Sequence, residues 1–202
     1  MSGRPPATGL SALWLAFTVA GFMTGFSSGF ILAHLGPAIL ILPTCVGAAV
    51  GLAQRPVLRM FIERAEGAAR WPEGLGGWVV GSAAGPGLAA VVAMVGNSRL
   101  HLADLGEAET WAVLVSLAAL AGGLTGLAQS RILRRYLRRA AVWIPASAVS
   151  WATAAVSAEL VPDRMGIGPF LLVALAGGLG MGLVSAATMS WLWTRGPRTA
   201  TD

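Results

Sequence analysis

The sequence predicts an all-α integral membrane protein with six transmembrane helices, arranged as three tandem helical hairpins with pseudo-repeat symmetry. The composition is the first observation behind this prediction. Of the 202 residues, 55% are apolar and 11% are charged, whereas a soluble domain has roughly 25% charged residues. The mean hydropathy of +0.70 is the second observation. So few charges cannot cover a globular surface in water, which excludes a disordered tail, a disulfide-rich secreted module and an ordinary cytosolic enzyme.

Stretches without charged side chains define the predicted spans. Each has at least about 18 residues, close to the roughly 20 that cross 30 Å of hydrocarbon at 1.5 Å per residue. The first stretch is too long for the apolar core of a secretory signal, so we expect it to remain as a helix. Together the spans form a single transmembrane domain over residues 1–202. They cover residues 10–33, 36–54, 74–96, 110–130, 141–158 and 167–194.

The arginines predict how the chain is oriented. There is no lysine, and 12 of the 14 arginines fall on the side that both termini share. Because arginine-rich short loops remain in the cytoplasm, we expect cytoplasmic N- and C-termini and a location in the bacterial inner membrane. The basic segments 55–72 and 131–140 then lie on the cytoplasmic face. The net charge of +5 describes this orientation, and we expect no nucleic-acid partner.

The two basic segments belong to an internal repeat. Residues 51–65 read GLAQRPVLRMFIERA and residues 126–140 read GLAQSRILRRYLRRA, with eight identities in fifteen positions at a shift of 75. A weaker third copy lies near the C-terminus, where Met189 takes the place of the glutamine. The repeated unit predicts that each hairpin begins with a tryptophan-led helix and returns through a helix of small residues.

Three tryptophans open corresponding spans of the repeat, namely Trp14, Trp78 and Trp143. An indole ring favours the boundary between hydrocarbon and water, because its body is apolar and its N–H bonds to polar partners. We therefore expect these three side chains to anchor the helices at the cytoplasmic interface.

Small residues four positions apart predict close packing between helices. The contact is expected within this chain, and a contact with a partner subunit is the alternative. The pairs are Gly47 with Gly51, Gly122 with Gly126, and Gly182 with Ala186.

The basic segments combine charge with an amphipathic pattern. Apolar residues recur at i, i+3, i+4 and i+7 from Leu58 and again from Leu133, so each segment is expected to lie in the interface with its apolar face down. The arginines then contact anionic lipid headgroups, unless they serve as a topology signal alone. The candidate lipid contacts are Arg59, Arg64, Arg131, Arg134, Arg135, Arg138 and Arg139.

Candidate chemistry inside the spans is sparse. No charged residue falls in the middle of a span, which argues against a proton-coupled pump with an intramembrane carboxylate. Gln54 and Gln129 occupy one repeat position, where an amide bridges helices, contacts a ligand or lies exposed at the cytoplasmic boundary. His34 and His101 are expected in loops and form no spaced metal motif. No catalytic triad is apparent, so we expect no enzyme activity and no cofactor.

The segments around Gln54 and Gln129, with the tryptophan-led span that follows each, resemble a loose group of bacterial polytopic membrane proteins. Hairpins of that group repeat the pattern G-x-x-x-G-x-x-Q-W-x-x-L-R. This chain departs from the pattern at Arg55 and Ser130, where the group often has tryptophan. The resemblance implies the hairpin architecture and implies no activity.

Two functional hypotheses follow. The first is a non-enzymatic membrane protein that serves as a structural or accessory subunit, through close contacts with a protein partner or with another copy of itself. The alternative is a small-solute transporter or channel with a pathway between the three hairpins. A continuous polar cavity that reaches Gln54 and Gln129 favours the transporter, whereas a closely packed centre favours the accessory subunit.

Overall fold

A computed structural model describes residues 7–66, 75–100, 105–161 and 167–195. Within these residues six helices are long and apolar enough to cross a membrane, as the sequence predicts. The fold is all-α, each predicted span corresponds to one helix, and the chain is a multi-pass membrane protein. The helices are α1 (Ala7–Leu32), α2 (Ala38–Glu66), α3 (Leu75–Leu100), α4 (Glu107–Leu133), α5 (Trp143–Glu159) and α6 (Ile167–Thr194).

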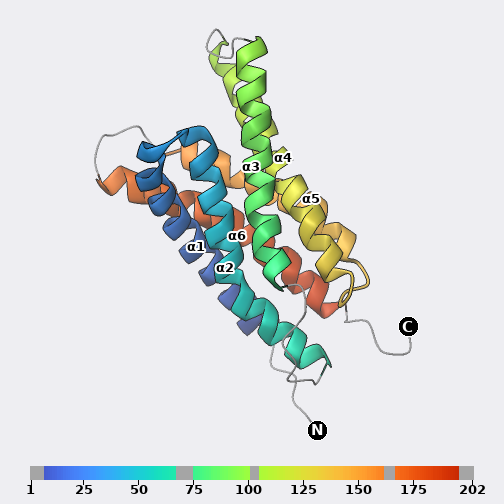
Figure 1. Cartoon of the computed structure of the whole chain (residues 1–202). Coiled ribbons are helices and arrows are strands. Elements are labelled where there is room, and N and C mark those ends of the chain that lie inside the picture. The colour runs from blue at the N-terminus through green and yellow to red at the C-terminus, as the bar shows by residue number, and fades with distance from the viewer. Residues whose placement is uncertain (1–6, 67–74, 101–104, 162–166, 196–202) are drawn as a thin grey trace.

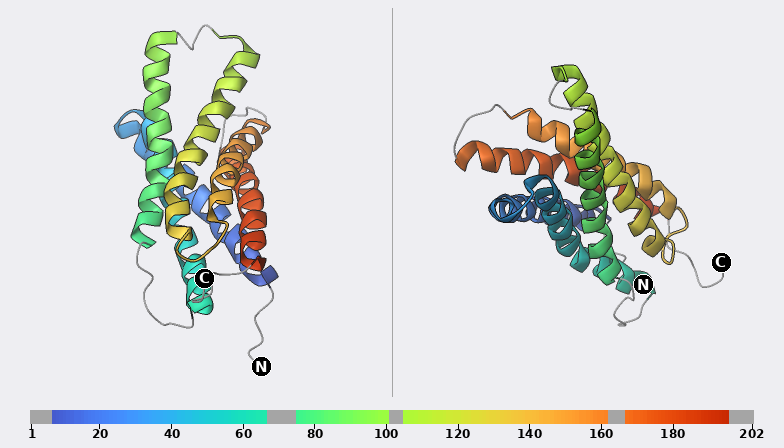
Figure 2. Two further views of the ribbon diagram at one scale, coloured as in Figure 1. Left: turned by 90° about the vertical axis from the view of Figure 1, so that its right-hand side faces the viewer. Right: turned by 45° about the horizontal axis from the view of Figure 1, so that its top comes forward.

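The helices form a closed ring. Each helix packs against its neighbours in chain order, and α6 packs against α1 to complete the circle. Figure 1 shows α3 and α4 rising beyond the other helices at the top of the view. Figure 2 shows these two helices separating toward the same end. The ring is thus drawn together at one end and spread at the other.

The end of the ring that carries the arginines of α2 and of the segment after α4 is called the basic end below. The larger of the two hydrophobic clusters lies there, and its fully buried members include Trp14, Leu58, Ile62 and Leu133. A smaller cluster around Phe22 lies farther from the basic end, along the length of the helices. Core packing is therefore concentrated at the basic end.

The basic segments differ from their predicted interfacial placement. α2 runs without interruption to Glu66, so the residues after Gln54 continue the span instead of starting a separate helix. Leu58 and Ile62 of α2 are buried in the core, and so is Leu137 after α4. The predicted apolar face exists, but it packs on protein and does not lie on lipid. The indoles of neighbouring helices provide a surface to which these side chains fit closely.

Candidate functional site

A layer of tryptophan side chains crosses the ring near the basic end. Trp14, Trp78 and Trp143 each lie about 6 Å from the other two, with ring centroids 5.9 to 6.0 Å apart. Their exposed fractions are 0%, 0% and 2%. These three residues are called the tryptophan layer. Trp14 meets the other two rings edge-to-face, whereas Trp78 and Trp143 are tilted relative to each other, and aromatic contacts of this kind add to the stability that burial provides.

The predicted role of these tryptophans as interface anchors is therefore wrong. A tryptophan favours the membrane interface because its N–H needs a polar partner. Here the partners are inside the protein, since Trp78 and Trp143 donate to glutamine side chains and Trp14 donates to a serine. The indoles consequently lie at the centre of the ring.

Gln54 and Gln129 each bridge helices. The Oε1 of Gln54 accepts the indole N–H of Trp78 at 3.2 Å, and its Nε2 donates to the hydroxyl of Thr18 at 3.0 Å. Gln129 makes the equivalent bonds, accepting from Trp143 at 2.6 Å and donating to Ser82 at 2.7 Å. Each amide thereby joins its own helix to the helix before it and the helix after it. Both glutamines are buried, so exposure at the boundary is not their role.

The predicted third copy of the repeat lacks this arrangement. Met189 occupies the position of the glutamine and is fully buried. The indole N–H of Trp14 instead reaches the hydroxyl of Ser185 at 3.2 Å, one helical turn away from Met189 on α6. Ser185 in turn donates to the carbonyl of Gly182. At the contact between α6 and α1, the hydrogen bond from Trp14 to Ser185 therefore stands where the contacts of α2 with α3 and of α4 with α5 have a bridging amide.

The predicted small-residue positions lie where helices approach most closely. The Cα of Gly47 faces the carbonyl of Ser82, and that of Gly122 faces the carbonyl of Ser147, so tightly that a Cβ on either glycine would overlap the oxygen. A Cβ on Gly182 would lie 2.6 Å from the Leu15 side chain. Close approach of this kind needs glycine. The remaining members, Gly51, Gly126 and Ala186, are also buried.

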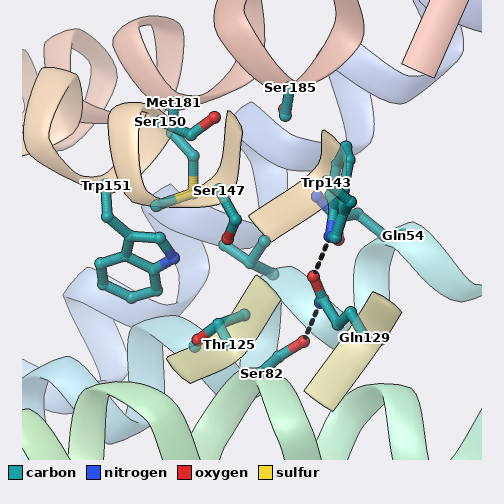
Figure 3. A pocket seen from close by; sticks show the side chains of 12 residues that line it. Gln54, Ser82, Thr125, Gln129, Trp143, Ser147, Ser150, Trp151, Met181 and Ser185 are labelled. Atoms are coloured by element: carbon teal, nitrogen blue, oxygen red, sulfur yellow. Dashed lines mark hydrogen bonds between the residues drawn. The ribbon is translucent and has the colours of Figure 1, made fainter. Parts of the chain in front are cut away.

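A small chamber, whose wall combines hydroxyl and amide groups with apolar side chains such as Val50 and Met181, lies next to the tryptophan layer (Figure 3). Its volume is about 20 Å³, which is room for about one water molecule. Thr125 on α4 is 3% exposed and its Oγ1 has no hydrogen-bond partner. The side chains around the chamber are uncharged. They include Gln54, Ser82, Thr125, Gln129, Trp143, Ser147, Ser150, Trp151 and Ser185.

A larger cavity lies on the side of the chamber away from the basic end. Its volume is about 400 Å³, within the range of roughly 300 to 1,000 Å³ that ligand pockets occupy. α1 to α5 all contribute to its wall, which is apolar except at Glu159. Its lining includes Phe22, Phe26, Leu42, Val46, Pro86, Ala90, Leu117, Ala118, Ala121, Trp151, Ala155 and Glu159.

The cavity and the chamber adjoin. Trp151 lines both of them. On α4, Ala121 lines the cavity and Thr125, one turn farther along, lines the chamber. Along the axis of the ring, the apolar cavity is therefore followed by the small chamber and then by the tryptophan layer.

The predicted lipid-contacting arginines lie around the outside of the basic end. Arg59 forms an ion pair with Glu63 one turn along α2. Arg139 lies over the ring of Trp191, 5.7 Å from its centroid. The side chain of Arg64 is outside the described residues. The remaining arginines of this group, which are exposed, are Arg131, Arg134, Arg135 and Arg138.

The histidines predicted to lie in loops are not brought to the site. His34 is exposed after α1 and packs edge-on against Phe30, and His101 lies outside the described residues. Among the residues that the structure describes, no three His, Cys, Asp or Glu side chains are grouped so that they could hold a metal ion.

Sequence reasoning missed the hydroxyl groups of the site. Thr18 and Ser82 each follow a layer tryptophan by four residues and donate to its carbonyl, at 2.8 and 2.7 Å. The spacing Trp-x-x-x-Ser/Thr recurs at Ser147 and was visible in the sequence. Thr125 carried no such signal, because a single hydroxyl within an apolar helix is common.

Comparisons with known proteins give no relative. No family model, curated protein or solved structure matches this chain.

Proposed function

We propose that the protein is a non-enzymatic integral membrane protein that binds an apolar molecule of the membrane in its central cavity. The observation that carries the proposal is the cavity of about 400 Å³ with an almost wholly apolar wall. A cavity of this size and lining suits an apolar ligand, since it offers contact area and few polar groups that need a partner. The cavity lies in the half of the ring where α3 and α4 separate.

The arginines support a bacterial inner-membrane location with cytoplasmic termini. Short loops rich in arginine stay in the cytoplasm, and the arginines after α4 are exposed around the basic end. In this orientation the tryptophan layer lies toward the cytoplasm and the cavity toward the opposite face. The same arginines suit contact with anionic headgroups of the cytoplasmic leaflet.

The equivalent bonds of Gln54 and Gln129 support an internal repeat. Each amide accepts from the tryptophan of the following hairpin and donates to a hydroxyl of its own hairpin. Two copies of a motif that make the same bonds between equivalent helices are expected from a repeated hairpin. The repeat therefore assigns the ring a pseudo-threefold axis through the tryptophan layer.

Binding without passage agrees with the way the ring is closed. The indoles of Trp14, Trp78 and Trp143 pack against one another across the ring. Gln54 and Gln129, which a polar pathway needs as free contacts, are occupied by bonds to indoles and hydroxyls. Transport by this protein would require the tryptophan layer to separate, whereas binding in the cavity requires no such movement.

Fluorescence quenching tests the proposal directly. An alkane brominated near its middle quenches an indole that it touches, and Trp151 lines the cavity. The full-length protein in phosphatidylcholine nanodiscs is titrated with this probe, and the signal of Trp151 is the difference between wild type and Trp151→Phe. We expect saturable quenching, because a bound probe fills a defined site.

A matched pair of variants separates the cavity from the lipid around the protein. Ala118→Phe places a ring in the cavity and is expected to abolish saturable quenching. Ala112→Phe places the same ring on an exposed position of the same helix and is expected to leave the quenching unchanged. Quenching that is linear in wild type, or that survives Ala118→Phe, contradicts the proposal.

An accessory subunit is a second candidate, favoured by a groove on the outside of the ring. The groove lies between α2 and α3, has a volume of about 580 Å³ and is apolar. Ala83, Ala84 and Gly87 of α3 line it, and small side chains allow another transmembrane helix to approach closely. Mass determination in mild detergent tests this role. A stable complex that Gly87→Leu dissociates supports it, and recovery of a monomer alone contradicts it.

A further inference from the structure

We infer that the molecule bound in the cavity is an amphiphilic cation, with its apolar body against the cavity wall and its positive charge beside the carboxylate of Glu159. The ligand class is a hydrocarbon body that carries an alkylammonium group at one end. This inference rests on the proposed function, because it places the body of the ligand in the cavity.

Glu159 differs in charge from the rest of the cavity wall. Among the described residues that line the cavity, it is the one that carries a charge, and the others are aliphatic residues, prolines, phenylalanines and a tryptophan. No ion pair joins Glu159 to another described residue. Its carboxylate is therefore able to attract a positively charged group of a molecule that fills the cavity.

The position of Glu159 on α5 places it at one end of the cavity. Trp151, Ala155, Ala158 and Glu159 share one face of this helix, because they are spaced i, i+4, i+7 and i+8, and all four line the cavity. The rise from Trp151 to Glu159 is about 12 Å along the helix. An elongated ligand of about this length can lie along the face, with its apolar end at Trp151 and its charged end at Glu159.

The end of the cavity at Glu159 reaches the surface of the protein. Glu159 is exposed, and Ile39 at the start of α2, which also lines the cavity, is 49% exposed. Phe22 and Ala121, which line the cavity nearer the tryptophan layer, are buried. A charged group beside Glu159 therefore keeps part of its hydration, so the high cost of burying a charge is avoided. The attached hydrocarbon body is buried at the same time.

Other charges at this end of the ring also favour a cation. α5 ends at Glu159, and the last carbonyl groups of a helix carry a partial negative charge. Glu107 and Glu109, which begin α4 at the same end, are exposed. The side chains of Arg99 and Arg164 are outside the described residues. An anionic amphiphile would place its headgroup against the carboxylate of Glu159, which like charges disfavour.

Competition with two probes of the same shape tests the inference. Decyltrimethylammonium and its uncharged analogue, in which carbon replaces nitrogen, each compete with the brominated alkane for the full-length protein in phosphatidylcholine nanodiscs. The quenching of Trp151 reports displacement from the cavity. Glu159→Gln retains the size of the side chain and removes its charge. We expect it to shift the ratio of the two affinities about two- to fivefold toward the uncharged probe, as for one exposed ion pair, and to leave the affinity of the uncharged probe unchanged.

Two further variants serve as controls. Glu159→Asp retains the charge and is expected to retain most of the preference for the cation. Glu109→Gln removes a carboxylate from the same end of the ring that does not line the cavity, so the ratio is expected to stay at the wild-type value. Because every ratio is measured in the same bilayer, unequal partitioning of the two probes into lipid cancels between variants.

The outcomes distinguish this inference from the proposed function. If the uncharged probe competes but Glu159→Gln leaves the ratio unchanged, the cavity binds apolar molecules and the role of Glu159 is wrong. An equal shift in Glu109→Gln also overturns the inference, because the charge would then act through the surface potential and not through contact at the cavity. A loss of affinity for decyl sulfate in Glu159→Gln contradicts it as well. If neither probe competes with the brominated alkane, the proposed function itself fails.

Discussion

The same helices form both halves of the ring, but different side chains lie at the centre of each half. At the basic end, large side chains such as Trp14, Trp78 and Leu133 point inward and are fully buried. In the opposite half, alanines such as Ala90, Ala118 and others line a cavity. These small side chains leave space at the axis of the hollow half, although larger side chains such as Phe22 and Trp151 also line its cavity. In the packed half the large side chains leave no such space.

The comparison also shows why the hollow half does not collapse. In water, burial of apolar surface would drive the helices together. In a membrane, lipid chains solvate apolar surface as well as other helices do, so close packing and polar bonds must hold helices together instead. The basic end has both, in the tryptophan layer and the bridging glutamines. The opposite half has neither across its centre, so the helices spread around the cavity.

Two tryptophans of α5 provide the strongest test of this comparison. Trp143 belongs to the tryptophan layer, whereas Trp151 lies two turns farther along and lines the cavity. Trp143→Ala removes a packed side chain and the bond to Gln129, so we expect a loss of about 3 to 5 kcal/mol in the free energy of unfolding. Trp151→Ala enlarges a space that already exists and is expected to cost about 1 kcal/mol.

Reversible unfolding in mixed detergent micelles, followed by far-ultraviolet circular dichroism, measures both changes. Trp143→Phe retains an aromatic ring without the N–H and is expected to lie between wild type and Trp143→Ala. Equal losses for Trp143→Ala and Trp151→Ala would break the comparison, because the two halves would then contribute alike to stability.

Adjacent glycines on α4 test the close approach that holds the packed half together. Gly122 faces the backbone of α5 at Ser147, while a Cβ on Gly123 would meet nothing within 4 Å. Gly122→Ala is expected to lower the free energy of unfolding by about 1 to 3 kcal/mol, because one helix must shift. Gly123→Ala is expected to stay within about 0.5 kcal/mol of wild type. The same unfolding assay measures both changes. If Gly122→Ala costs as little as Gly123→Ala, α4 and α5 can move apart to accept the methyl group, and the close approach does not contribute to stability.

Much of the packed half could be predicted from the sequence. The low charge and the spacing of apolar stretches identified the six spans, because a membrane imposes length and composition on every helix. The repeated motif points to Gln54 and Gln129, and helix bridging is one of the roles that the sequence allows them. The predicted position of the tryptophans at the interface is wrong, because the partner of an indole N–H depends on which helices meet, and one sequence does not reveal that.

The hollow half left almost no signal in the sequence. An alanine that lines a cavity, such as Ala118, looks the same as an exposed alanine such as Ala112 on the same helix. Thr125 likewise resembles any single hydroxyl in an apolar span, and its burial against Gly85 depends on how α3 and α4 meet. Cavities arise from the relative tilt of helices, which the pattern along one chain does not specify.

The seam between α6 and α1 provides the finest test, because it is the place where the packed half departs from its own pattern. Met189 is buried at the position that glutamine occupies in the other two copies. Met189→Gln places an amide where it can accept from Trp14 and donate to Ser147, as Gln129 does with Trp143 and Ser82. We expect a gain of about 0.5 kcal/mol in the free energy of unfolding, the usual value of a polar bond between membrane helices.

The exchange in the opposite direction makes this prediction decisive. Gln129→Met gives the seam between α4 and α5 the composition of the α6 and α1 seam, and it leaves the N–H of Trp143 without its acceptor. The expected cost is about 1 kcal/mol, measured in the same unfolding assay with Met189→Leu as the control for a change of shape alone. Because the proposed repeat makes the two positions equivalent, it requires the two changes in stability to have opposite signs. A loss of stability on Met189→Gln would mean that the third seam has repacked around methionine and Ser185, and that the threefold description holds for the helices but not for their polar contacts.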